Sequence, residues 1–510
     1  MRPPTPLLSA SVGFISLCAV PPAHSDTLDE IHSKGELTWG ADAVEGGAPY
    51  VFLEDSNRED SYIGFEVDLA AALARELGVK ARLVQNAWDS LVPGLLKGDY
   101  HLALNGLEIT EDRAEVVAFS KPYYVASEQL TVRKESSHIN SLADLKGKKV
   151  GTLKASLAER ILAGAGGIDV APYEGQSTAY EDLALGRVEA VLMDYPIALY
   201  YGNIDPRLRL TGGPISEAQY GIAVRKGDAA LLAAVNDALD RLAAKGELRR
   251  IYETWGLWND ATARRLGDTR PGDAPAPRFE EYRRRTGAES AAGARWSRYA
   301  DALPLLLEAA GTTLWISLIA MALAIALGIT LAVARLYAPS PVAALAYAYV
   351  EVVRGTPLLV QLYLLYYGLP NLGVNLPPDL AGILALGLNY AAYEAENYRA
   401  GILSVAGTQR EAAVALGLTP PQAFRHVILP QAVRVSLPTV TNDFIALLKD
   451  SSIVSVITII ELTNRSRELS GTTFDYLGFG LLTAAIYFLM GLPFAWMARR
   501  LEKRMAVYIR

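Results

Sequence analysis

The sequence predicts an exported α/β domain of two lobes, followed by an all-α membrane domain of about five helices. Residues 26–298 mix charged and apolar residues as a soluble domain does, whereas long runs of Leu, Ala, Val and Ile begin near residue 303. In the first part, strand and helix signals alternate. The 510 residues have room for both domains, and the formal charge of -7 gives no general basic signature for nucleic acid.

The N-terminus has the features of a secretory signal peptide over residues 1–25. Arg2 precedes a largely apolar stretch at residues 6–20, and a small-residue cleavage site follows near residues 23–25. Cys18 leaves open a lipid anchor, and an uncleaved signal could act as an additional membrane anchor. Because Cys18 is the single cysteine, the chain has no intrachain disulfide framework and no Cys-based zinc site.

Alternating strands and helices are expected throughout residues 26–259. The strands are predicted at residues 37–40, 80–85, 101–104, 149–153 and 190–193, and the helices at residues 69–77, 91–96, 178–185 and 229–244. Alternation at this spacing predicts parallel sheets sandwiched by helices. The length of the segment suits two α/β lobes.

The next segment, residues 260–302, is predicted to be a linker. Asp, Pro, Gly, Ala and Arg dominate residues 267–277, a composition typical of a flexible or extended tether. Residues 279–282 and 296–299 are expected to form short helices at the outer membrane surface.

The membrane domain is expected over residues 303–510. Apolar segments near the roughly 20 residues that a bilayer requires lie at residues 307–333, 345–369, 379–401, 435–460 and 474–497. If the first crossing starts outside, the polar stretch after the third segment and the C-terminus both lie inside. Basic residues agree with this topology, at Arg335, Arg399, Arg410, Arg425, Arg434, Arg499, Arg500, Lys503 and Arg504.

The polar stretch between the third and fourth predicted spans has the pattern of two short helices. Thr408 and Glu411 have the spacing of a capping box, and Gly417 stands where a left-handed C-terminal cap would end the first helix. Thr419 and Gln422 repeat the capping spacing and begin the second helix. The stretch is therefore predicted to be a helix, a glycine turn and another helix.

Residues 408–430 of this stretch resemble the EAA loop of ABC-importer permeases. The matching residues are Glu411, Ala412, Ala413 and Gly417, followed after nine residues by Val427, Ile428, Leu429 and Pro430, with Val427 in place of the usual Ile. The resemblance implies that the loop docks on a cytoplasmic ATPase subunit and that the first four of these residues couple the two subunits. An amphipathic hairpin on the membrane surface is the alternative.

The exported half resembles the periplasmic solute-binding proteins of polar amino-acid importers along its whole length. The matching segments are residues 40–42, 64–70, 88–93, 105–113, 119–124, 193–194 and 219–223. The resemblance implies two lobes joined by two hinge strands near residues 123–127 and 218–222, with the second lobe at about residues 126–216. In the membrane half, residues 354–361, 442–444 and 447–450 resemble the amino-acid branch of the permeases.

The resemblance also implies how an amino acid would be held. Arg113 offers a planar bidentate donor to a buried carboxylate, and Asp194, on the opposite lobe, would bind the ammonium group. Trp88 takes the position of an aromatic wall against the ligand side chain. The alternatives are a surface ion pair for Arg113, a core aromatic for Trp88 and a helix cap for Asp194.

Further candidate ligand contacts are Asp42, Asn105, Gly106, Glu108 and Ser156. The resemblance implies a main-chain hydrogen bond from Gly106, a hydroxyl hydrogen bond from Ser156, and an acid at Asp42 that reaches toward the ligand. Glu108 departs from the family, which has a small hydroxyl residue there. Its carboxylate either receives a cationic side chain or an extra amine, or pairs with a local Arg or Lys. Residues 43–50 also depart, because they lack an expected aromatic just after Asp42.

Polar residues inside the predicted spans are candidates for the translocation path, because burying them in a membrane is costly. Asn389 and Glu396 recur at helical spacing and could line a pore. Glu396 could equally pair with Arg399 on the next turn.

The resemblance implies the binding and permease subunit of an ATP-driven importer of a polar amino acid, in the lipid of the bacterial inner membrane with its binding domain in the periplasm. The chain has no Gly-x4-Gly-Lys-Ser/Thr loop, so ATP and Mg²⁺ are assigned to a partner ATPase and the chain is not itself an enzyme. A permease of this type resembles half of a pore, which implies a permease homodimer or a paired permease. The alternative is a ligand-gated ion channel of the bacterial glutamate-receptor type, whose pore would interrupt the binding domain.

Overall fold

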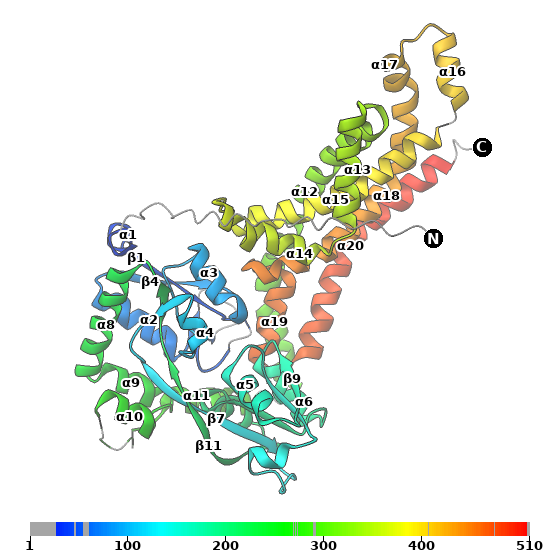
Figure 1. Ribbon diagram of the computed structural model, residues 1–510. Coiled ribbons are helices and arrows are strands. Elements are labelled where there is room, and N and C mark those ends of the chain that lie inside the picture. Colours follow the sequence, from blue (N-terminus) through cyan, green and yellow to red (C-terminus); the bar gives the residue numbers. More distant parts are fainter. Residues whose placement is uncertain are drawn as a thin grey trace, which may run out of the picture.

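Two α/β lobes and a helical membrane domain form the computed structural model (Figure 1). It describes residues 27–44, 47–54, 61–268, 270, 272, 274–288, 292–405, 407–473 and 475–506. The predicted signal peptide lies outside the described residues. In Figure 1 the lobes lie at one end of the molecule, and the membrane helices extend away from them to a tip that carries α16 (Gly407–Ala415) and α17 (Pro420–Ala423).

The first lobe is built on a five-stranded sheet of order β4-β1-β5-β12-β6. Its strands are β1 (Glu36–Ala41), β4 (Lys80–Gln85), β5 (Leu102–Ala103), β6 (Val117–Phe119) and β12 (Ala223–Arg225). Its helices are α1 (Thr27–Lys34), α2 (Phe65–Glu76), α3 (Leu91–Lys97), α4 (Glu111–Ala114), α8 (Ala229–Ala244) and α9 (Glu247–Thr254). β1 pairs in parallel with β4 and β5 and is almost wholly buried, as expected for a central strand covered on both faces.

The second lobe has a separate five-stranded sheet of order β11-β7-β10-β8-β9. Its strands are β7 (Tyr124–Arg133), β8 (Lys149–Leu153), β9 (Asp169–Tyr173), β10 (Ala190–Asp194) and β11 (Leu208–Tyr220). The helices are α5 (Leu157–Ala165), α6 (Gln176–Ala184) and the short α7 (Tyr195–Ile197). A small hairpin of β2 (Phe52–Leu53) and β3 (Tyr62–Ile63) projects from the first lobe.

The chain crosses between the two sheets twice. It passes from β6 to β7 and returns from β11 to β12, and β7 and β11 pair antiparallel with Tyr220 opposite Tyr124. The Tyr124 ring packs against Tyr220 and Tyr252, with centroid distances of 5.6 and 5.2 Å. The crossings therefore form a buried aromatic hinge between the lobes.

The first part of the segment predicted to be a linker is packed on the binding lobes, whereas residues 292–302 form the start of α12 and so include the second helix expected there. The first part contains α10 (Asp260–Leu266) and α11 (Pro277–Ala288). Thr262 hydrogen-bonds the backbone of Val125 on the hinge strand β7. From α11, the Tyr282 ring contacts Phe52 of the first lobe at 5.6 Å and Tyr200 of the second lobe at 5.0 Å. The expected helix over 279–282 thus lies on the lobes rather than at the membrane, because its aromatic side chains pack against aromatic rings of the lobes.

We expect Tyr282→Ala to destabilise the binding lobes by about 3 kcal/mol, the usual cost of truncating a buried aromatic side chain. Tyr282 is 7% exposed and joins both lobes through ring contacts. Arg283→Ala, one residue along on the exposed face of α11, is the matched control and should change stability by less than about 0.5 kcal/mol. Thermal unfolding of the two variants checks the prediction; equal melting temperatures would contradict the packing role of Tyr282.

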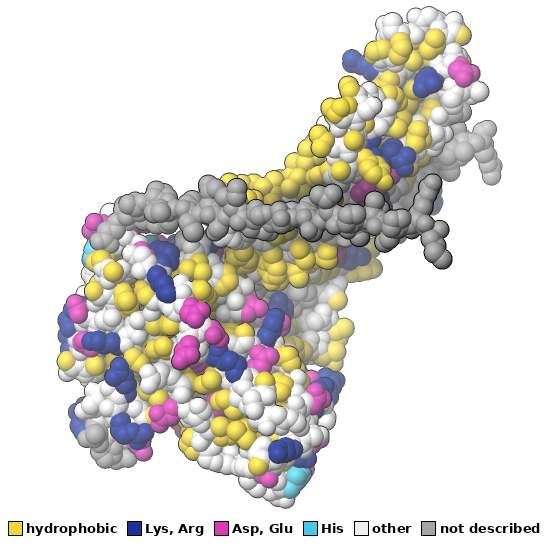
Figure 2. Space-filling model, in the orientation of Figure 1, with side chains coloured by type: hydrophobic (Ala, Val, Ile, Leu, Met, Phe, Trp, Pro, Cys, Tyr) yellow, Lys and Arg dark blue, Asp and Glu magenta, His cyan; other side chains and the backbone are white. Residues whose placement is uncertain are grey.

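The membrane half consists of helices. They are α12 (Ala292–Tyr337), α13 (Ser340–Arg354), α14 (Leu358–Tyr363), α15 (Pro378–Ser404), α18 (Leu429–Asp450), α19 (Leu462–Thr473) and α20 (Tyr476–Ala506). Close approach of α12 and α15 depends on two glycines. A Cβ on Gly387 would lie 2.6 Å from the Leu323 side chain, and one on Gly328 would lie 2.6 Å from Cβ of Glu394. Figure 2 shows apolar side chains over these helices and mixed charges on the lobes.

Two described helices, over Trp296–Tyr337 and Tyr476–Arg500, are each long and apolar enough to cross a membrane. The predicted span at 345–369 is not one straight helix, because α13 and the residues Leu358–Leu372 meet at a bend of 108°. Pro357 stands at the break, where it has no N–H to continue the helix. If the bent pair is one span, there are three. The predicted spans at 379–401 and 435–460 fall on α15 and α18, which are less apolar.

The first lobe touches the membrane half directly. The Tyr366 hydroxyl donates to Asp99 at 2.9 Å, and the Lys97 ammonium lies 3.6 Å from the Tyr366 ring centroid. The Tyr62 hydroxyl donates to Glu468 of α19 at 2.9 Å. The lobes therefore rest on the end of the helices that is opposite the tip formed by α16 and α17 (Figure 1).

Candidate functional site

A cavity lies between the two lobes. Residues of both lobes line it: Tyr50, Trp88, Asn105, Gly106, Glu108, Leu153, Ser156, Ala158, Glu174, Gln176, Met193, Asp194 and Ile197. The lining includes the predicted contacts Trp88, Asn105, Gly106, Glu108, Ser156 and Asp194. Arg113 and Asp42 are not part of it. The cavity is therefore polar and acidic on one side, with one aromatic ring from each of Tyr50 and Trp88.

Asp194, the last residue of β10, presents a buried carboxylate to the cavity. Its Oδ2 accepts hydrogen bonds from the hydroxyls of Tyr220 and, at 3.4 Å, of Tyr50. Burial, together with the negative charge of Glu108, raises the pKa of Asp194 to about 6, although the hydroxyl of Tyr220 opposes this shift. Asp194 is therefore mainly ionised at neutral pH and can bind a cation.

Glu128 lies directly opposite Asp194 in the pairing of β7 with β10. It is fully buried, and neither carboxyl oxygen has a hydrogen-bond partner within the part of the chain that the structure describes. Burial and the charge of Asp194 raise the pKa of Glu128 well above its usual value. Burial and the neighbouring charge therefore favour the neutral form of Glu128 and leave the negative charge of the pair on Asp194.

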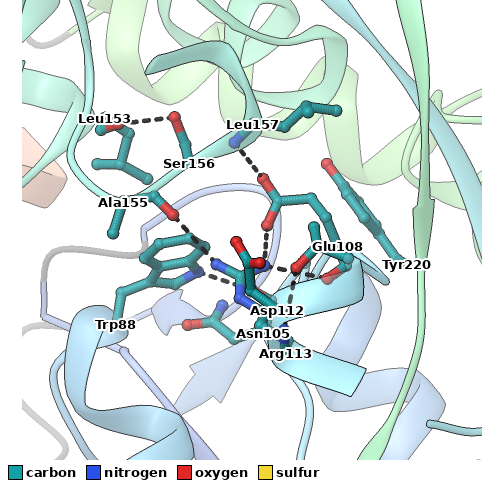
Figure 3. Close-up of polar contacts among 12 residues, drawn as sticks. Trp88, Asn105, Glu108, Asp112, Arg113, Leu153, Ala155, Ser156, Leu157 and Tyr220 are labelled. Atoms are coloured by element: carbon teal, nitrogen blue, oxygen red, sulfur yellow. Dashed lines mark hydrogen bonds and ion pairs between the residues drawn. The ribbon is translucent and has the colours of Figure 1, made fainter. Parts of the chain in front are cut away.

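Glu108 pairs with Arg113 and also reaches the second lobe (Figure 3). One carboxylate oxygen accepts from the Arg113 guanidinium, and the other accepts from the backbone N–H of Leu157, at the start of α5, at 3.0 Å. The Arg113 guanidinium also donates to the Glu108 carbonyl at 3.1 Å and to the Ala155 carbonyl at 3.2 Å. Of the two roles left open for Glu108, the structure contains the pairing with a local Arg, and the carboxylate still lines the cavity.

Trp88 forms one wall of the cavity and is held on both sides. Its indole N–H donates to the Asn105 carbonyl at 3.1 Å, and the Arg113 guanidinium lies 4.9 Å from its ring. Its backbone N–H donates to Asp42 at 2.9 Å. The Asp42 carboxylate also accepts from the Val44 N–H at 3.0 Å. Asp42 therefore orders the loops behind the cavity instead of reaching into it.

Two other predicted contacts line the cavity with their polar groups already engaged. The Ser156 hydroxyl caps α5 by accepting from the Glu159 N–H at 3.1 Å, and it donates to the Leu153 carbonyl at 2.6 Å. The Gly106 N–H donates to the buried carboxylate of Glu66 at 2.7 Å. Burial raises the pKa of Glu66 to about 7. In this geometry Ser156 and Gly106 shape the cavity wall.

Sequence reasoning missed three residues around Asp194. The aromatic expected just after Asp42 is missing there, but Tyr50, eight residues further on, lines the cavity, and its ring lies against Gly106. Tyr220 was predicted to lie in a hinge strand, yet no role at the ligand site was predicted for it. Glu128 is an acidic residue in a strand that is otherwise mostly buried, and this pattern was the available signal.

The polar candidates in the membrane half are paired. The Asn389 amide donates to Gln361 of α14 at 3.1 Å, which ties α15 to the bent helix pair. Glu396 forms ion pairs with Arg335 of α12 and with Arg399, the latter at 2.8 Å. These contacts favour the pairing interpretation of Glu396 over a pore-lining one.

The predicted two-helix loop has the expected glycine turn and one of its two capping boxes. α16 begins at Gly407, before the expected cap at Thr408. Gly417 follows with a left-handed φ of 85°, and its N–H donates to the Val414 carbonyl at 2.9 Å. The second capping box forms between Thr419 and Gln422. Two apolar side chains near this turn are exposed to solvent. Val414 is 51% exposed and Leu416 is 84% exposed.

The geometry defines a bilobed binding domain joined to a helical permease. Residues 42–257 match the family of bacterial extracellular solute-binding proteins, family 3. Residues 324–507 match the binding-protein-dependent transport system inner membrane component. The first match falls on the α/β lobes and the second on the membrane helices.

Relatives of both halves are known. A probable amino-acid ABC transporter permease of Sinorhizobium fredii is 40% identical over 188 residues, covering 37% of this chain and 81% of that protein. The glutamine transport system permease protein GlnP of Escherichia coli is 36% identical over 214 residues, covering 42% of this chain and 98% of that protein. The L-cystine-binding protein TcyJ of Escherichia coli is 34% identical over 236 residues, covering 46% of this chain and 87% of that protein.

Solved structures include the arginine-bound form of a binding protein from T. maritima, 36% identical, covering 42% of this chain and 99% of that one, with a TM-score of 0.39. The chain belongs to the family of polar amino-acid ABC transporters, with the solute-binding domain and the permease in one polypeptide. It is a transport component without a catalytic role of its own. This assignment replaces the alternative of a ligand-gated channel.

Proposed function

We propose that the chain binds one polar amino acid in the cavity between its lobes, in the periplasm, and passes it to a pore formed by its membrane helices. The observation that carries the proposal is the buried carboxylate of Asp194, which lines this cavity at the end of β10. A ligand ammonium would bind there by a charge-assisted hydrogen bond. Because Arg113 lies on the other lobe, a zwitterion would hold the lobes together and favour closure.

Arg113 retains donors for a ligand carboxylate. A guanidinium has five N–H groups. Three hydrogen bonds are formed, to the Glu108 side chain, to the Glu108 carbonyl and to the Ala155 carbonyl. The remaining donors support a carboxylate that shares the guanidinium with Glu108. The Trp88 ring beneath Arg113 would then face the aliphatic part of the ligand.

Energy for transport would come from a separate cytoplasmic ATPase that binds ATP and Mg²⁺. The docking surface proposed for it is the loop of α16 and α17, with Glu411, Ala412, Ala413 and Gly417 as the coupling residues. This loop lies at the end of the permease that is remote from the binding lobes (Figure 1). Exposed Leu416 and Val414 at its turn favour a protein partner there. A permease homodimer in the bacterial inner membrane would complete the pore.

Calorimetric titration of the purified full-length chain tests the binding proposal. The panel is the standard amino acids with L-cystine and glutamine included, because relatives carry these solutes in their names. Tight binding of at least one zwitterion is expected. Absence of binding to every amino acid would overturn the proposal. Copurification of an ATPase subunit, lost when Glu411 and Gly417 are replaced together, tests the partner.

Amino-acid affinity should fall as the pH falls through about 6, because the ammonium requires ionised Asp194. The pKa of this carboxyl is raised, so the charge is present above that value and is lost below it. Between pH 7.5 and 5, the affinity should weaken about tenfold, because only about one tenth of a carboxyl group is ionised one pH unit below its pKa. Titrations at both pH values check this, and an unchanged affinity would contradict the assigned role of Asp194.

A further inference from the structure

Glu108 binds two donors that would otherwise suit the carboxylate of a ligand. Its side chain is 3% exposed, and its two oxygens lie on the guanidinium of Arg113 and on the N–H of Leu157, the first residue of α5. A guanidinium and a helix N-terminal amide are common partners of free carboxylates. The protein therefore carries one carboxylate of its own in the region where an amino-acid ligand would place its carboxylate.

Glu108 can accept a further cationic group. A carboxylate has about four lone-pair positions, and two of those on Glu108 are used, one on each oxygen. The side chain lines the cavity, so the remaining positions face the space that a ligand would fill. Glu108 is therefore both a link between the lobes and an acceptor available to the solute.

The charges on the inner lining do not balance. Glu108 and Asp194 are two carboxylates, whereas the lining residues include no Lys or Arg, and the cation paired with Glu108 is the partly buried Arg113. Glu174 also lines the cavity, but its side chain is 63% exposed and pairs with Lys154 at 2.9 Å. A zwitterion with a neutral side chain would leave this excess negative charge in place. A solute with one additional positive group would neutralise it.

We propose that Glu108 is the residue that determines specificity at this site, and that it selects solutes with two positively charged nitrogen groups. One group binds to Asp194 and the second binds to Glu108. This inference rests on the proposed function, since it concerns the same cavity. The charge balance is met in full by an amino acid with a cationic side chain, whose carboxylate shares Arg113. A diamine has the same two cationic groups without the carboxylate.

The test compares Glu108→Gln with the wild-type chain, both full-length. Glutamine at this position keeps the size and an oxygen that accepts from Leu157, but removes the charge. Glu159→Gln is the matched control, because Glu159 is a carboxylate in the first turn of the same helix and does not line the cavity. Calorimetric titrations use L-lysine, L-glutamine and 1,4-diaminobutane as probes.

Wild-type protein and the Glu159 variant should bind lysine at least tenfold more tightly than glutamine. Glu108→Gln should lose at least tenfold in lysine affinity, while its affinity for glutamine stays the same or improves. A loss of equal size for both amino acids would show that Glu108 only links the lobes, and it would overturn the inference. So would a wild-type preference for glutamine.

Further outcomes distinguish free amines from cationic amino acids as the solute, and failure of the inference from failure of the proposed function. Diaminobutane binding within tenfold of lysine would assign the site to free amines, and much weaker binding would assign it to cationic amino acids. In both cases the role of Glu108 in specificity is supported if Glu108→Gln loses affinity for the cationic solute. If the wild-type chain binds none of the standard amino acids and no diamine, the proposed function fails together with the inference. If it binds neutral amino acids as tightly as lysine, the inference alone fails.

Discussion

Asp194→Asn should lower the affinity for the transported amino acid at least about 100-fold, roughly 3 kcal/mol, the upper range for a hydrogen bond to a charged group. The variant keeps the shape of the side chain and an oxygen for the hydroxyls of Tyr220 and Tyr50, so the fold should persist. It removes the negative charge that an ammonium group requires. Calorimetry on the full chain measures the loss directly.

The control for this variant is Asp169→Asn, an exposed carboxylate on β9 of the same lobe. It should bind as tightly as the wild type. The Asp194 variant should also melt no lower than the wild type, because Asp194 is a buried charge beside a second acidic group, Glu128. A Kd within threefold of the wild-type value would contradict Asp194 as the ammonium site.

The two-lobed fold could be predicted because its signals are local. The strands at β1, β4, β8 and β10 lie where the alternation of apolar runs and helical periodicity indicated. The expectation of parallel sheets was only partly right, because β7 pairs antiparallel with β10 and β11, and β12 pairs antiparallel with β5 and β6. These antiparallel strands follow the two crossings between the lobes, which the local alternation of strands and helices does not reveal. The fold class of both halves is confirmed.

The shape of the membrane half was predicted less well, because hydropathy indicates the length of an apolar run but not its direction. A run at 345–369 reads as one span, yet the backbone turns by 108° where Pro357 interrupts it. The linker is a similar case. The Tyr282 ring contacts Phe52 and Tyr200, which are distant from it in sequence.

The candidate site was predictable in its residue types but not in its pairings. Six predicted contacts line the cavity, and they lie at the ends of strands and helices or in the loops beside them. The roles of Glu108 and Asp42 depended on neighbours from other segments. Glu108 meets Leu157 of the other lobe, and Asp42 meets the N–H of Trp88. Spacing along the chain carries no information on such contacts.

The glycine turn between α16 and α17 provides the second large effect. Gly417→Val should reduce ATP-driven uptake about 5- to 30-fold, because a side chain in the left-handed region costs about 1–2 kcal/mol. Gly417 has a φ of 85°, and a Cβ there would meet nothing within 4 Å. The substitution therefore acts by displacing the turn, and with it the exposed Leu416, rather than by a clash.

Gly407→Ala is the matched control, because Gly407 begins α16 without a positive φ and also has open space around its Cβ position. Uptake into proteoliposomes, with the partner ATPase present, should be near the wild-type rate for this variant and reduced for Gly417→Val. Both should bind the amino acid normally, since the loop lies at the far end of the permease from the lobes (Figure 1). Normal uptake by Gly417→Val would show that the turn does not couple the subunits, and a simultaneous loss of binding would point to misfolding instead.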